Sequence, residues 1–175
     1  MGSSSGAGDR LAAFGERLAE VHDALREELD RLREDAGAHL AGRGKWSREL
    51  RAHCLAFCAA VERHHTGEDD GAFPVLARRY PELGAVIERL EQDHHLVAAI
   101  LRRMEDLLDG VEPPVPETEA RRVKGELDGL AAILESHFTY EERQITAALD
   151  SLAVPAWTEV TPAFLRRPGD EEPGD

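Results

Sequence analysis

Apolar residues recur three and four positions apart along four long stretches of the chain, which is the spacing of amphipathic helices. We expect helices over about residues 9–35, 45–70, 81–109 and 117–151. Glycine- and proline-containing segments separate them, chiefly residues 37–44 and the run GVEPPVP at 110–116. Pro74 interrupts the stretch 71–80, so a separate short helix or turn is predicted to begin there.

Four helices joined by short to moderate connections predict an all-α fold, an antiparallel up-down four-helix bundle. The bundle is expected to span residues 9–151, after a flexible N-terminal segment of residues 1–8. Residues 152–175 contain four prolines and end in DEEPGD, which predicts an extended, partly disordered C-terminal tail. The tail residues suited to packing on the bundle are Trp157, Phe164 and Leu165.

Composition narrows the classes of partner. The 175 residues suffice for one domain with a core, and no apolar run approaches the ~20 residues of a membrane span. The net charge of −14 disfavours nucleic acid and anionic membranes. The N-terminus lacks an apolar signal region, and Cys54 and Cys58, four apart on one predicted helix, fit a reducing compartment. We therefore expect a cytoplasmic protein, monomeric or homodimeric.

Histidines and glutamates fall on the predicted inward faces of all four helices. His64 and Glu68 are four residues apart, so they point from one helix face at the same place. The same spacing relates His137 to Glu141. Two further histidines lie within the apolar stripes of the first and third helices, at positions His22 and His94.

This set of side chains favours a metal site. A single histidine on an apolar face is more often a structural core residue than a ligand. Four on four helices, two of them paired with a glutamate, reverse that preference, because burying them without partners would be costly. Nitrogen and oxygen donors without thiolate suit iron, manganese or zinc. Cys54 and Cys58 are better interpreted as small apolar residues than as ligands.

Several neighbouring residues have open or peripheral roles. His65 lies about 100° from His64, at the edge of the inward face, and could be a ligand or not. His95, Glu91 and Tyr140 are candidates for contacts around the site rather than for direct ligands. The remaining polar residues near these segments are expected at the core edge (His53), in a solvated loop (His39), or on the rim (Asp69, Glu142).

The segments HHTGEDDGAFPVL, LEQDHHLVAAIL and HFTYEERQITAAL, after the early core residue His22, resemble the hemerythrin-like, or HHE cation-binding, family. The resemblance covers about residues 18–149 and implies a hemerythrin-like bundle that holds two iron ions. It implies Glu68 and Glu141 as bridging carboxylates. The implied terminal imidazole ligands are His22, His64, His94 and His137.

The chain departs from the oxygen-carrying hemerythrins on its third helix. Those proteins carry a His-x-x-x-His pair there, whereas Leu90 precedes His94 by four residues and Glu91 precedes His95 by four. One or two imidazoles are therefore missing. His65 fills the gap, or Glu91 with His95 does, or one iron keeps an open position.

The resemblance implies a di-iron protein that binds or reacts with dioxygen, peroxide or nitric oxide in a redox or stress context. A di-iron oxidase or oxygenase acting on a small molecule is the alternative, so an enzymatic activity is left open. A second alternative is an iron-sensing or metal-stabilised binding module without catalysis.

Overall fold

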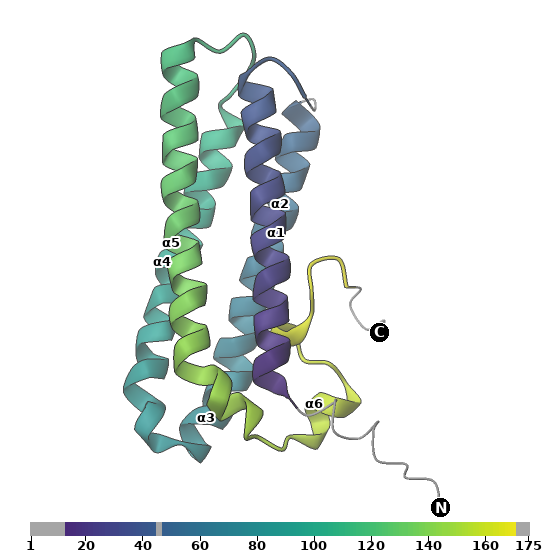
Figure 1. Ribbon diagram of the computed structural model, residues 1–175, viewed down its shortest axis with the longest axis vertical. Coiled ribbons are helices and arrows are strands. Elements are labelled where there is room, and N and C mark those ends of the chain that lie inside the picture. Colours follow the sequence, from purple (N-terminus) through teal and green to yellow (C-terminus); the bar gives the residue numbers. More distant parts are fainter. Residues whose placement is uncertain (1–12, 45–46, 171–175) are drawn as a thin grey trace, which may run out of the picture.

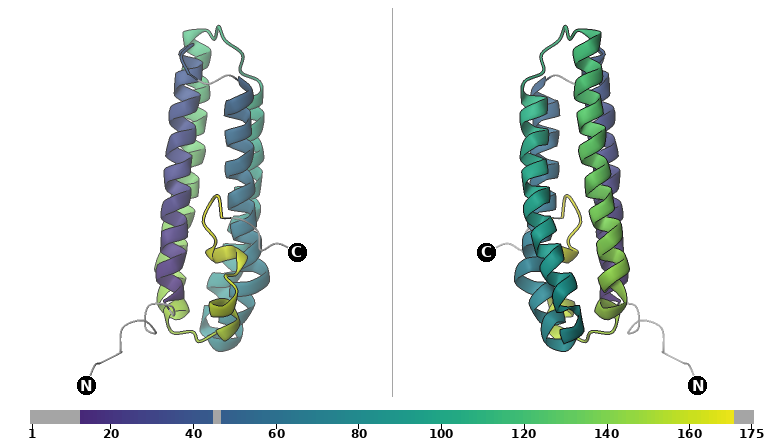
Figure 2. Two further views of the ribbon diagram at one scale, coloured as in Figure 1. Left: turned by 90° about the vertical axis from the view of Figure 1, so that its right-hand side faces the viewer. Right: turned by 90° about the vertical axis from the view of Figure 1, so that its left-hand side faces the viewer.

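Four long helices form the body of the computed structural model, which describes residues 13–44 and 47–170 (Figure 1). They are α1 (Phe14–Leu40), α2 (Ser47–Gly67), α4 (Gly84–Asp109) and α5 (Glu117–Asp150). α1 packs against α2 and α5, and α4 packs against the same two helices. Every neighbouring pair is therefore antiparallel, and the predicted all-α, up-down four-helix bundle is confirmed (Figure 2).

Shorter elements connect and flank these helices. A π-helix (Glu68–Ala72) continues α2 directly into α3 (Phe73–Arg79), and a short 3₁₀ turn (Pro81–Leu83) leads into α4. The backbone stays in the right-handed helical region at Gly67 and at Phe73, on either side of the π-helix. The expectation that helical geometry continues beyond Gly67 is thus confirmed, and Pro74 lies in the first turn of α3, as its fixed φ allows.

The first helix ends later than expected. The apolar stripe continues through Ala36 and Leu40, both buried, so α1 runs past Gly37 instead of stopping there. His39 is consequently not a solvated loop residue: its side chain is buried, and its Nε2 lies 3.1 Å from the Val111 carbonyl oxygen. The predicted helix start at residue 9, the flexible residues 1–8 and the end of the tail at 171–175 lie outside the described residues.

The buried apolar residues form two clusters, one toward each end of the bundle. The lower cluster joins the N-terminal end of α1, the π-helix, α3, the start of α4 and the end of α5. The upper cluster fills the bundle toward the loops that follow α1 and α4. The histidines and glutamates predicted as candidate metal ligands lie between these two clusters along the bundle. The bundle therefore contains one polar layer between two apolar ones.

The tail is less extended than expected. Residues Pro155–Glu159 form the short helix α6, and Ala163–Leu165 form a 3₁₀ turn, here called η3. Phe164 is completely buried in the lower cluster. The ring of Trp157 meets those of Phe14 and Phe164 edge-on, with ring centroids 5.1 and 5.2 Å apart. This segment lies against the lower half of the bundle (Figure 2).

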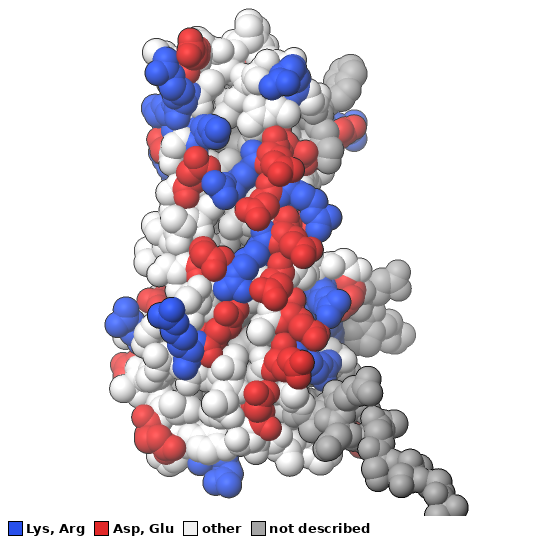
Figure 3. All heavy atoms as spheres, viewed as in Figure 1, with Lys and Arg blue, Asp and Glu red and all other residues white. Residues whose placement is uncertain are grey.

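Charged side chains of both signs alternate over the outer face of α1 and α5 (Figure 3). Arg26 on α1 reaches Glu135 and Glu142 on α5, with N–O distances of 2.7 and 2.8 Å. Arg33 reaches Asp128 in the same way at 2.7 Å. These ion pairs link α1 to α5 along their outer faces. No helix in the described part of the chain is long and apolar enough to cross a membrane.

Gly15 tests the docking of α1 on α5. Its backbone N–H donates to Asp150 Oδ1 at 2.8 Å, and an added Cβ would collide with the Thr146 carbonyl oxygen. Gly15→Ala should lower the free energy of unfolding by about 1–3 kcal/mol through overpacking. Gly125→Ala is the matched control, because nothing lies near its Cβ position; it should raise stability by up to ~1 kcal/mol. Urea unfolding measures both, and equal effects would contradict the packing argument.

Candidate metal centre

Seven buried side chains from four helices and the π-helix meet in the polar layer. The structure places them in two groups, and in each group the ligand-type atoms lie within 4.8 Å of one another. One group contains His22, His64, Glu68 and Glu141, and the other contains His65, His94 and His137. The six residues predicted from the sequence as metal ligands, and His65, whose role was open, are therefore brought together.

The carboxylates connect the two groups. Glu68 Oε1 lies 3.2 Å from His64 Nε2, while its other oxygen lies 3.3 Å from His94 Nε2. Glu141 Oε2 lies 3.3 Å from His137 Nε2 and 4.0 Å from His22 Nε2. Each carboxylate thus faces an imidazole of either group, which is the arrangement that two bridged ions require.

The outer nitrogens of three histidines are held by hydrogen bonds. His64 Nδ1 donates to the Phe164 carbonyl oxygen at 2.8 Å, because a carbonyl can only accept. His22 Nδ1 donates to Glu142 at 2.9 Å, and His94 Nδ1 donates to Asp69 at 2.7 Å. Such bonds fix the tautomer and leave Nε2 unprotonated toward the site.

The imidazoles of His22 and His64 face each other inside the layer. Their Nε2 atoms are 3.0 Å apart. At that distance either a proton shared between the rings or a cation bound by both satisfies the two nitrogens.

Many other polar atoms in the layer have no hydrogen-bond partner. These buried atoms are His65 Nε2, His94 Nε2, both ring nitrogens of His137, and both oxygens of Glu68 and of Glu141. Leaving a buried donor or acceptor unpaired costs about 1–3 kcal/mol per group. Metal coordination would satisfy the Nε2 atoms and the carboxylate oxygens together, whereas His137 Nδ1 faces Asp93 at 4.0 Å. The two His/Glu clusters therefore fit a dinuclear metal site.

Burial sets the protonation of these groups. Desolvation, with repulsion from His22, lowers the pKa of His64 to about 3, and burial lowers that of His65 well below its ordinary value. Burial and the nearby carboxyl of Glu141 raise the pKa of Glu68. Burial also acts to raise the pKa of Glu141, but Glu68 and the imidazole of His137 outweigh it and hold that pKa well below its ordinary value. Neutral imidazoles are the form that binds metal.

The residues with open roles now have positions. His65 lies in the site, with its ring stacked on that of His94 at a centroid distance of 4.0 Å. His95 is exposed and Glu91 is half-buried, and neither belongs to the clusters. The 100° step per residue that brings His94 inward turns His95 toward solvent. The Arg89 guanidinium lies over the ring of Tyr140, with Arg89 Cζ 4.9 Å from the ring centroid.

Sequence reasoning missed the groups that hold the histidines. Asp69 and Glu142, expected on the rim, are hydrogen-bonded to His94 and His22. A signal existed, because an acidic residue directly follows the glutamate of both His-x-x-x-Glu pairs. The Phe164 carbonyl had no such signal. His53 belongs to neither of the two His/Glu groups, and its Nδ1 is hydrogen-bonded to Asp35 at 2.8 Å.

The comparison with protein families agrees with this site. The family model described as hemerythrin HHE cation binding domain matches residues 14–149 of the chain. The chain belongs to this family. No curated protein and no protein of known structure shows significant similarity to the chain.

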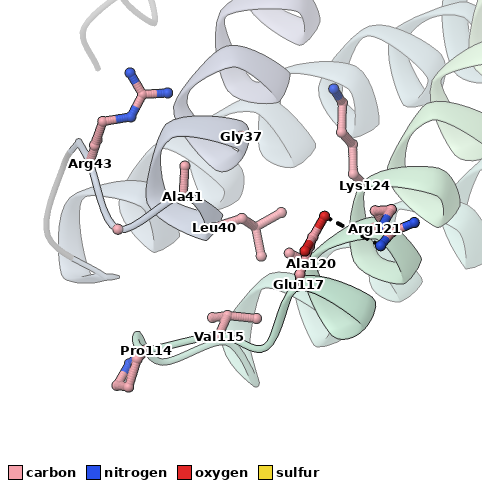
Figure 4. A pocket seen from close by; sticks show the side chains of 11 residues that line it. Gly37, Leu40, Ala41, Arg43, Pro114, Val115, Glu117, Ala120, Arg121 and Lys124 are labelled. Atoms are coloured by element: carbon pink, nitrogen blue, oxygen red, sulfur yellow. Dashed lines mark hydrogen bonds and ion pairs between the residues drawn. The ribbon is translucent and has the colours of Figure 1, made fainter.

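Of the hollows on the described surface, one lies away from the two His/Glu groups and another reaches them. A cavity of about 650 Å³ lies at the end of the bundle between the C-terminus of α1 and the start of α5, with Arg43, Arg121 and Lys124 on its walls (Figure 4). None of the cluster residues lines it. A groove of about 390 Å³ between α4 and α5 reaches His137, and its rim carries the exposed apolar residues Leu96 and Ile133.

The pKa values predict how the metal-free protein responds to acid. At His64 the folded state binds fewer protons than the unfolded chain as pH falls from 6.5 toward 3, and the lowered pKa of His65 acts in the same direction. Stability should therefore fall with pH in this window, by up to about 1.4 kcal/mol per pH unit for each histidine. Glu68, with its raised pKa, opposes this, but it is one group against two.

Urea unfolding of chelator-treated protein at about pH 7 and about pH 5 measures this effect. The same protein saturated with zinc serves as the reference, because bound metal keeps the histidines deprotonated. Equal or greater stability of the metal-free protein at the lower pH would contradict the assignment.

Proposed function

We propose that this chain is a non-heme di-iron protein that binds or reacts with dioxygen, peroxide or nitric oxide in a redox or stress context. The observation that supports it most directly is the close approach of the His22 and His64 Nε2 atoms, 3.0 Å apart, beside the carboxylates of Glu68 and Glu141. A donor set of imidazole and carboxylate without thiolate suits iron, with manganese or zinc as substitutes.

The two groups are unequal in donors. His65, His94 and His137 offer three imidazoles to one ion, whereas His22 and His64 offer two to the other, with Glu68 and Glu141 shared. The ion on the His22 side therefore has fewer protein ligands and more room for a small exogenous molecule. Iron, when bound, would supply the one-electron redox chemistry that a reaction with dioxygen or peroxide requires.

The surrounding residues keep the site dry and its ligands oriented. The ring of Phe138 stacks on His22 at a centroid distance of 4.4 Å, and that of Phe73 stacks on His94 at 5.5 Å. Asp69 and Glu142 hold the Nδ1 protons of His94 and His22, so each imidazole keeps its Nε2 lone pair toward the ions. A water-excluded site of this kind favours small, weakly polar molecules such as dioxygen and nitric oxide.

Metal content and reactivity test the proposal together. Anaerobically reconstituted protein should hold two irons per chain, and its ultraviolet–visible spectrum should change when dioxygen, hydrogen peroxide or nitric oxide is added. Glu68→Ala or Glu141→Ala should abolish stoichiometric binding of two ions and lower thermal stability, because the histidines lose a shared partner. His95→Ala, which removes an exposed histidine next to His94 on α4, is the control and should change neither.

Two outcomes would contradict the proposal. One zinc or no metal in well-folded protein would remove its di-iron basis. Two irons that respond to none of the three molecules would favour the alternative of an iron-sensing or metal-stabilised module without catalysis.

The groove between α4 and α5 supports a second candidate, a di-iron oxidase or oxygenase. Its apolar rim and its contact with His137 would place a small apolar substrate beside the cluster. The groove, however, reaches the group with three imidazoles, where an ion has the fewest free positions. For this reason oxidation of an organic substrate ranks second.

Narrowing the groove tests that candidate. Leu96→Trp should slow oxidation of phenol, used as a probe, by about tenfold without changing the metal content, because the larger ring obstructs the path to His137. Leu55→Trp is the control, since Leu55 is a similarly exposed leucine outside this groove. Equal rates for the two variants, or no phenol oxidation by the unmodified protein, would exclude the groove as a substrate path.

A further inference from the structure

The segment of residues 155–165, here called the C-terminal strap, follows the part of the chain that matches the HHE family. The family match ends at residue 149. The strap comprises α6, η3 and the residues between them, and η3 packs against α1, α2 and the π-helix. It therefore contacts the two long helices that supply His22 and His64.

The strap supplies a direct partner to one of the metal-site histidines. The carbonyl oxygen of Phe164 accepts a hydrogen bond from His64 Nδ1 at 2.8 Å, in a buried position. Since the carbonyl has no proton to donate, this bond requires the tautomer of His64 that is protonated on Nδ1. The unprotonated Nε2 then faces His22 Nε2 and Glu68 Oε1.

Gly67 makes this close approach possible. It has an ordinary helical φ of −63°, so glycine is not needed there for its backbone freedom. A Cβ at this position would instead lie 2.7 Å from the Phe164 backbone nitrogen and 3.0 Å from Ala163 Cβ. The missing side chain at the end of α2 therefore leaves the space that the strap occupies.

Contacts on both sides of Phe164 hold the strap in place. The ring of Trp157 packs edge-on against the rings of Phe14 and Phe164. Just after the strap, Arg167 pairs with Glu20 on α1 at 2.7 Å. The position of the Phe164 carbonyl is thus set by the lower apolar cluster and by α1, not by His64 alone.

We propose that the C-terminal strap is part of the metal centre, with Phe164 as a positioning residue for His64. Its carbonyl fixes the tautomer and the orientation of that imidazole, which belongs to the group with only two imidazoles, while its side chain and that of Leu165 anchor the strap in the lower apolar cluster. The strap thereby determines how tightly the ion at this group is retained relative to its neighbour. The proposal rests on the dinuclear site proposed above, and concerns one ion of the two.

Gly67→Ala separates the strap's role from general stability. Alanine favours helix more than glycine does, yet its Cβ would displace Phe164 and Ala163. In protein loaded with two Co²⁺ ions, the variant should keep its helical circular dichroism. It should release one ion to a chelator on the order of tenfold faster than the unmodified protein, with an altered visible absorption of that ion. Gly125→Ala, with open space at its Cβ, should release both ions at the original rates.

A second pair of variants keeps the test decisive if Gly67→Ala fails to fold. Phe164→Ala removes the buried anchor and should reproduce the selective loss of one ion, whereas Phe164→Leu, which still fills the lower cluster, should largely restore retention. Release of both ions at the original rates from the folded Gly67→Ala or Phe164→Ala protein would overturn the strap's role. Failure of the unmodified protein to bind two ions would instead overturn the proposed di-metal site.

Discussion

The constraint on which this structure depends is the burial of five imidazoles and two carboxylates in a single layer of an otherwise apolar bundle. Unpaired, such groups would oppose folding by several kcal/mol in total. The Nε2 atoms of His22 and His64, 3.0 Å apart, show this constraint most directly. The donor set around them fits two cations.

Much of the surrounding structure serves that layer. Apolar clusters above and below it exclude water, so charge interactions inside it are strong. Asp69, Glu142 and the Phe164 carbonyl each hold the outer nitrogen of one histidine. Rotation of any of these imidazoles would break its hydrogen bond. The ligand directions are therefore set before a metal arrives, which is the purpose of a preorganised site.

The two sides of the layer differ. On the side of the three-imidazole group, the groove between α4 and α5 brings solvent close to His137. On the side of His64, the C-terminal strap packs against α1 and α2, and its Phe164 carbonyl accepts a hydrogen bond from His64. A molecule small enough to diffuse through packed side chains could reach either ion, whereas a larger one is confined to the groove. This difference supports the proposed binding of small inorganic ligands over that of organic substrates.

Local pattern determined the helices and most of the candidate ligands. Helical periodicity alone placed His22, His64, His94 and His137 on inward faces, because side-chain direction in a helix follows from residue number. The His-x-x-x-Glu spacing likewise paired His64 with Glu68 and His137 with Glu141. Periodicity was weakest at helix ends, where it stopped α1 before Leu40 and assigned the buried His39 to solvent.

Only the tertiary structure decided between His65 and the pair of Glu91 and His95, since all three lie near the boundary of an inward face. The choice depends on how α2 and α4 are rotated against each other, which packing determines. The same holds for the Phe164 carbonyl. No residue type marks a backbone oxygen that will accept such a hydrogen bond. Phe164 lies 100 residues after His64 in the sequence, and only the fold brings the two together.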